Sequence, residues 1–154
     1  MSLSARIRRL FAEGPPAQER AVERLRTLVV GAEEAAIRAE RMVPDLRSER
    51  FRRDLAQVAE RDRAVGTALR AQLARLGLAG PPPVRDTAAV DGSTFQRLSV
   101  LAEREQELAR EALSLASVEE DDTLRQVLES AGDTHRNHGT EIALAASLIT
   151  SFVR

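Results

Sequence analysis

Cysteine, lysine, tryptophan and tyrosine are all absent from this chain of 154 residues, and its aromatic residues are four phenylalanines. Without cysteine the chain can form no disulfide, no thiolate zinc site and no iron–sulfur cluster. Its 23 basic and 24 acidic residues leave a formal net charge of −1. A net charge this close to zero gives the chain no overall electrostatic attraction to nucleic acid or to an acidic membrane surface.

Long hydrophobic runs are also missing. The longest apolar stretch, Ile142–Val153, is too short to cross a bilayer and is interrupted by Ser147, Thr150 and Ser151. Met1–Phe11 lacks the continuous apolar region of a secretory signal. We therefore expect a cytoplasmic protein.

The first 13 residues predict a short amphipathic helix that ends at Gly14 and two prolines. A basic amphipathic helix can lie on a membrane surface. It can also pack as a lid on the rest of the fold, which we favour for a segment of this length. Membrane association is the weaker alternative.

Leucine, alanine and charged residues are abundant, which is typical of an all-α bundle. Amphipathic patterns predict four long helices, at about 17–42, 45–78, 93–116 and 117–154. We expect Asp45 to cap the second helix. Capping boxes that begin at Ser93 and Ser117 are expected for the third and fourth helices.

The connections predict the topology of these helices. The first and second helices, and the third and fourth, are joined by a few residues, so each pair is expected to form an antiparallel hairpin. The proline-rich linker 79–92 can reach roughly 43 Å at ~3.1 Å per residue. That is about the length of the second helix at ~1.5 Å per residue. The second and third helices are therefore expected to run parallel.

Both histidines, His135 and His138, lie on the apolar seam of the fourth helix, whose positions recur every three or four residues. A shift of 73 residues places the seam of the second helix on this one and moves Asp62 onto His135. The same shift moves Ala32 of the first helix onto Glu105 of the third. The chain thus reads as two similar hairpins.

On these residues the chain resembles the ferritin-like superfamily, the bundles of bacterioferritins and rubrerythrins. The resemblance implies a di-metal site with one Glu from each of the first and third helices and a Glu-x-x-His from each of the second and fourth. Glu105 matches the third-helix ligand. The other motifs read Asp62-Arg63-Ala64-Val65 and His135-Arg136-Asn137-His138, and Ala32 replaces the first-helix Glu. A complete di-iron site is therefore not expected.

Four inward ionisable residues remain at a similar level of the bundle: Asp62, Glu105, His135 and His138. Two imidazoles and two carboxylates can hold one divalent ion of iron, manganese or zinc. Glu33, at the edge of the apolar face, would add a fifth ligand after a small rotation of its helix. The alternative, which we favour, is a metal-free network in which the carboxylates accept hydrogen bonds from the histidines.

The function expected from these patterns is a non-catalytic structural or interaction module, with a stress-related or metal-related role as the resemblance implies. The alternative is a mononuclear metal-binding protein or a metal-dependent oxidoreductase.

The arginines around the first hairpin, such as Arg38 and Arg41, alternate with acidic residues and indicate an ion-pair surface rather than a nucleic-acid site. Leu144 and Leu148 lie off the seam and predict a homodimer through the fourth helix.

Overall fold

The computed structural model describes residues 15–151 of the chain, with side chains described from 19 to 149. The helix predicted over 1–13 lies outside the described residues. The described part is all-α and contains four long helices and one short 3₁₀ turn. Their bounds are α2 Pro15–Met42, η1 Val43–Asp45, α3 Glu49–Arg75, α4 Thr94–Val118 and α5 Asp122–Ser151.

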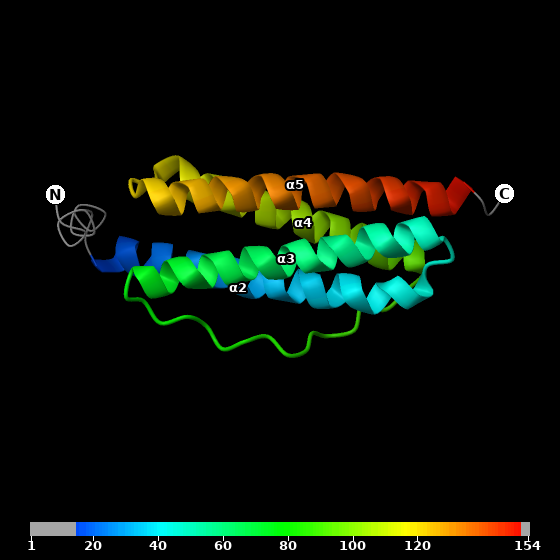
Figure 1. Ribbon diagram of the computed structural model, residues 1–154, viewed down its shortest axis with the longest axis horizontal. Helices are drawn as coiled ribbons and strands as arrows, with labels where there is room; N and C mark the ends of the chain where they lie inside the picture. Colours follow the sequence, from blue (N-terminus) through cyan, green and yellow to red (C-terminus); the bar gives the residue numbers. More distant parts are fainter. Residues whose placement is uncertain (1–14, 152–154) are drawn as a thin grey trace.

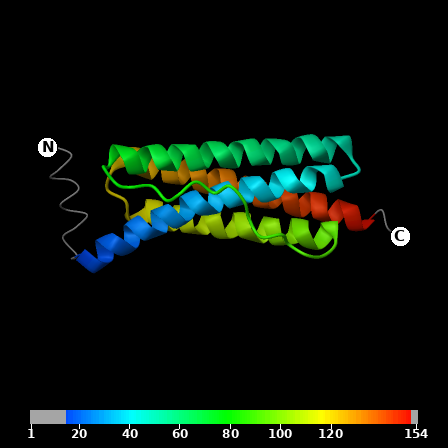
Figure 2. The ribbon, with the colours of Figure 1, turned by 90° about the horizontal axis from the view of Figure 1, so that it is seen from below.

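The four helices lie side by side along the long axis of the molecule (Figure 1). α2 packs against α3 and α4 packs against α5, while α2 also contacts α4 and α3 also contacts α5. In Figure 2 the colours of α3 and α4 advance in the same direction, opposite to those of α2 and α5. The prediction of two antiparallel hairpins with parallel α3 and α4 is confirmed.

The linker between α3 and α4 runs extended along the outside of α2 (Figures 1 and 2). Arginine side chains hold it there. Arg26 Nε donates to the Ala79 carbonyl at 2.9 Å, Arg70 Nη1 to the Pro81 carbonyl at 2.6 Å, and Arg41 Nη1 to the Thr87 carbonyl at 2.8 Å. The linker therefore spans the bundle as a strap that is bound through its main chain.

The second helix of the prediction begins and ends at other residues than expected. Its N-cap is Ser48, whose side chain accepts from the Phe51 N–H at 3.4 Å, and not Asp45. Asp45 instead accepts from Arg97 Nη2 at 2.7 Å. At the other end Gly77 adopts φ +70°, and the Gly77 and Leu78 N–H groups donate back to Ala74 and Leu73. This Schellman-type end stops α3 at Arg75, before the prolines are reached.

Of the two predicted capping boxes, one is confirmed and one is wrong. Ser93 and Gln96 cap α4 reciprocally, as expected. The predicted box at Ser117 is absent because α4 continues through Val118 and the Ser117 hydroxyl donates to the Ser114 carbonyl at 2.8 Å. Asp121 caps the start of α5 instead of Ser117, and its side chain accepts from the Leu124 N–H at 2.8 Å.

The core combines leucines with many small residues, which lets the helices approach closely. Ala32, Ala35, Ala36 and Ala39 give α2 a fully buried alanine face. On α5 Gly132 packs against α4 so tightly that a Cβ atom there would lie 2.5 Å from Leu113 Cγ. Glycine at this position sets the distance between α4 and α5.

In the described part of the chain no helix is long and apolar enough to span a membrane.

Replacing Gly132 by valine is expected to lower the free energy of unfolding by ~2 kcal/mol, because the new side chain overpacks the contact with Leu113. Urea unfolding followed by circular dichroism measures the loss. Ala143→Val is the matched control, since Ala143 is an exposed residue of the same helix and carries only the ~0.5 kcal/mol propensity difference. Equal losses in the two variants would contradict the close approach of α4 and α5 at Gly132.

Candidate metal centre

Three helices bring the four predicted ionisable side chains together in the middle of the bundle. Asp62 comes from α3, Glu105 from α4, and His135 and His138 from α5. Each of the four residues is at most 1% exposed. They are the buried polar and charged residues of the described core, and a ligand atom of each lies within 4.8 Å of those of the other three, so the predicted convergence is confirmed.

The contacts within this cluster pair each histidine with a carboxylate. His135 Nδ1 lies 2.6 Å from Glu105 Oε2, and His138 Nδ1 lies 2.9 Å from Asp62 Oδ1. The cross distances are longer, 3.4 Å from His135 Nδ1 to Asp62 Oδ1 and 3.9 Å from His138 Nδ1 to Glu105 Oε2. Both imidazoles therefore direct Nδ1 toward both carboxylates.

These four atoms have the arrangement of a ligand shell. All of them lie within 4.8 Å of one another. A tetrahedral zinc ion with bonds of about 2.0–2.1 Å holds its ligand atoms about 3.3–3.4 Å apart. The four nitrogen–oxygen distances, from 2.6 to 3.9 Å, lie on either side of that value. Shifts of less than 1 Å would make these distances equal to those around an ion.

The second oxygen of each carboxylate and the second nitrogen of each imidazole have no hydrogen-bond partner in the described structure. Asp62 Oδ2, Glu105 Oε1 and both histidine Nε2 atoms are buried and unpaired within the described structure. A buried carboxylate oxygen without a donor is costly, because its negative charge is no longer solvated. A cation bound to the other oxygen of each carboxylate would compensate that charge. The two unpaired carboxylate oxygens thus fit a positively charged occupant, whereas the two Nε2 atoms would remain unpaired donors when Nδ1 binds the ion.

Burial also changes the proton affinity of the cluster. It raises the pKa of the Asp62 and Glu105 carboxyl groups to about 7 and lowers the pKa of His135 to about 4. Burial lowers the pKa of His138 as well, but the hydrogen bond and the charge of Asp62 outweigh it, so that this pKa is raised. The core therefore resists carrying two carboxylate charges without a cation near them.

Glu33, the fifth predicted ligand, is not brought into this cluster. Its carboxylate forms a bidentate pair with Arg70, at 2.5 Å from Nε to Oε1 and 2.9 Å from Nη2 to Oε2. It also accepts from the Val84 N–H of the linker at 3.1 Å. The Arg70 guanidinium holds the pKa of Glu33 below its usual value. In this arrangement Glu33 fastens the linker to the bundle, a role that sequence reasoning missed together with its partner Arg70.

The remaining side of the centre, formed by α2, carries no ligand. Ala32, the residue that replaces the expected glutamate, is fully buried beside Gly66, which lies one helical turn from Asp62. Outside the cluster, a groove of about 620 Å³ lies between α4 and α5. Gln106 and Gly139, which directly follow Glu105 and His138 in the sequence, are among its lining residues.

Comparison of the chain with models of protein families, with curated proteins and with solved structures found no match. The structure itself defines the class of protein. It is an all-α four-helix bundle with a buried cluster of one aspartate, one glutamate and two histidines.

Glu33→Gln is expected to leave metal binding unchanged and to lower the free energy of unfolding by about 1 kcal/mol at pH 7, since the pair with Arg70 is partly screened by solvent. The lowered pKa means that this stabilisation is present above the unfolded pKa of Glu33, near 4.5, and is lost as the pH falls through the folded value. Urea unfolding between pH 3 and pH 7 tests both statements.

Glu34→Gln serves as the control, because Glu34 directly follows Glu33 in the same helix but has no hydrogen bond or ion pair with the described residues. A loss of bound metal in Glu33→Gln alone would show that Glu33 is a ligand after all.

Proposed function

We propose that this chain is a ferritin-like bundle that binds one divalent metal ion through Asp62, Glu105, His135 and His138. The observation that carries the proposal is the convergence of four ligand atoms within 4.8 Å in the core. Two imidazole nitrogens and two carboxylate oxygens suit zinc, manganese or iron. The likeness to ferritin-like proteins rests on the two hairpins, the long crossover and the surviving part of the ligand pattern.

Charge balance supports a divalent ion in particular. Two ionised carboxylates contribute two negative charges to a site that is at most 1% exposed, and the histidines ligate as neutral imidazoles. A divalent cation makes this set neutral, which is the state that a low-dielectric core tolerates best. Binding would displace the protons that the raised carboxyl pKa values otherwise retain.

The site supports a structural rather than a catalytic role for the ion. Structural zinc sites are closed by four protein ligands, whereas catalytic sites keep one position open for water or substrate. Here four side chains surround the position, and each is nearly inaccessible to solvent. We infer a non-catalytic module in which the ion fastens α3 and α4 to α5.

A metal-free network is the second candidate. The hydrogen bonds from His135 to Glu105 and from His138 to Asp62 pair both histidines without any ion. Such a network would also fix the register of α5 against its neighbours. The protein would then be a structural or interaction module whose polar core specifies one packing.

Bound metal separates the two candidates. Protein purified without a tag or a chelator is expected to contain about one metal ion per chain by elemental analysis. His138→Ala should lose this metal, because it removes one of four ligands. After the metal is removed with a chelator and the chelator is dialysed away, added zinc, manganese or iron should raise the melting temperature of the chain, by an amount that corresponds to about 2.7 kcal/mol at a free ion concentration of 100 Kd.

The control for this experiment is Asp133→Asn, which removes an exposed carboxylate of the same helix. It should keep both the metal and the melting-temperature increase. A native protein that contains no metal, and whose melting temperature none of the three ions raises, would leave the metal-free network as the function of the cluster.

The predicted homodimer remains a proposal. Leu144 is 61% exposed and Leu148 is 37% exposed on α5, so both are available to a second copy of the chain. Leu148→Glu should shift the mass measured by light scattering toward that of a monomer. Val118→Glu alters a 70% exposed apolar residue at the end of α4 and should not change the mass. A native chain that is monomeric at high concentration would contradict the dimer.

A further inference from the structure

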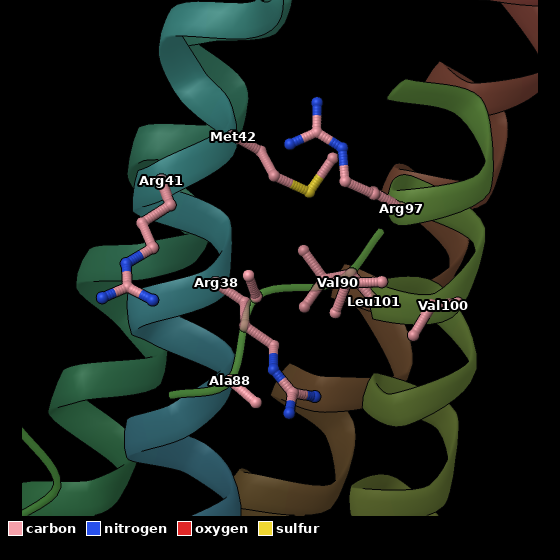
Figure 3. A pocket seen from close by; sticks show the side chains of 9 residues that line it. Arg38, Arg41, Met42, Ala88, Val90, Arg97, Val100 and Leu101 are labelled. Atoms are coloured by element: carbon pink, nitrogen blue, oxygen red, sulfur yellow. The ribbon is translucent and has the colours of Figure 1, made fainter. Parts of the chain in front are cut away.

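A second site lies at the surface, where the linker crosses between α2 and α4. A pocket of about 110 Å³ is enclosed there by the end of α2, by linker residues Ala88–Val90 and by the first turns of α4. Figure 3 shows Arg38 reaching from α2 toward α4, and Arg97 reaching from α4 toward Met42. None of the metal-centre residues lines this pocket.

The pocket has a surplus of positive charge. Three arginines line it, and two of them have carboxylate partners: Arg41 pairs with Asp86, and Arg97 Nη2 donates to Asp45 at 2.7 Å. Arg38 has no carboxylate partner in the described structure, and its Nε donates to the neutral hydroxyl of Thr87 at 3.0 Å. The guanidinium of Arg38 therefore retains an uncompensated charge and free N–H groups.

Arg97 contributes a second unsatisfied donor. Its Nε is shielded from solvent and has no hydrogen-bond partner among the described residues. A buried donor without an acceptor is unfavourable, and it adds to the positive character of the Met42 end of the pocket. Figure 3 shows the guanidinium groups of Arg38 and Arg97 at opposite ends of the pocket, with Val90 and Leu101 between them, so the head group of a small anion would meet only one of them.

The other walls are apolar. Met42, Val90, Val100 and Leu101 line the pocket together with two alanines of the linker. Its volume is well below the 300 Å³ at which sites for drug-sized ligands begin. It is closer to the ~150 Å³ cavity that accepts a benzene molecule. The occupant that fits is small and has an apolar body.

We propose that this pocket binds a small organic anion, with its oxygen head group on Arg38 and its apolar body against Met42, Val100 and Leu101. A guanidinium recognises a carboxylate or phosphate head through parallel N–H···O bonds. Because Ala88–Val90 form one wall, the bound anion contacts α2, the linker and α4 together. The proposal is independent of the metal centre.

Benzoate is the probe of choice, because it joins a carboxylate to a ring of suitable size. Titration of the full chain, followed by amide shifts in NMR spectra, should show saturable changes at Ala88, Ala89 and Val90. Phenyl phosphate tests whether the head group can also be a phosphate, and benzyl alcohol tests whether the charge is needed. Benzyl alcohol should bind at least about tenfold more weakly than the anions, since it lacks the charge-assisted bonds.

Two variants test the assigned contacts. Arg38→Gln should weaken benzoate binding about tenfold or more, and Val100→Asp should do the same by placing a negative charge in the apolar wall. Arg61→Gln, at an exposed arginine of α3, should leave the affinity unchanged. Each variant is first checked for native helicity by circular dichroism.

Three results would overturn the proposal. These are benzoate and benzyl alcohol binding equally, Arg38→Gln binding as well as Arg61→Gln, and shift changes that lie away from the linker. Binding of phenyl phosphate but not benzoate would support the site and assign its ligands to the phosphate class.

Discussion

The structure depends on a single constraint, which is that four ionisable side chains are buried where none can reach water. Asp62, Glu105, His135 and His138 are each at most 1% exposed. Removing one partner from such a set costs about 3–5 kcal/mol, because the other charge remains buried and unpaired. A slip of α5 by one turn along α3 and α4 would separate every pair at once. The cluster therefore selects one register for three helices that otherwise share leucine and alanine contacts.

Other features of the bundle serve this register. Gly132 lies one turn before His135, and Gly139 directly follows His138. At each glycine a Cβ atom would lie within 2.5 Å of an α4 side chain, Leu113 in one case and Gln106 in the other. At Gly132 the small residue brings α5 close to α4, whereas at Gly139 the neighbour is the flexible end of Gln106, which could move aside. The alanine face of α2 closes the remaining side without adding a ligand.

The helices, their parallel crossover and the four members of the cluster could be predicted because each leaves a periodic signal in the sequence. Polar residues on an apolar seam are conspicuous, and two seams that contain them at matching positions must meet. Helix caps were less predictable, since several candidates lie within a few residues. Both Asp45 and Ser48 are candidates for the start of α3, and in the structure Ser48 caps the helix while Asp45 pairs with Arg97, 52 residues further along the chain.

Glu33 illustrates a different limit. Its helical position, at the edge of the apolar face, was predicted correctly, but the direction of its side chain was not. Periodicity fixes the angle at which a residue leaves its helix and says nothing of its rotamer or of a partner 37 residues away. The pair with Arg70 exists only after α3 has packed against α2, and the contact with Val84 only after the linker has folded back along α2.

The way the linker is held has a consequence for its sequence. Three arginines of the helices, Arg26, Arg70 and Arg41, donate to carbonyl oxygens of Ala79, Pro81 and Thr87, atoms that every amino acid provides. These three contacts do not depend on the side chains of the linker, whereas Asp86 and Thr87 add side-chain contacts to Arg41 and Arg38. At Ala79, Pro81 and Thr87 the linker is therefore positioned by arginines of the helices, and only at Asp86 and Thr87 do its own side chains contribute.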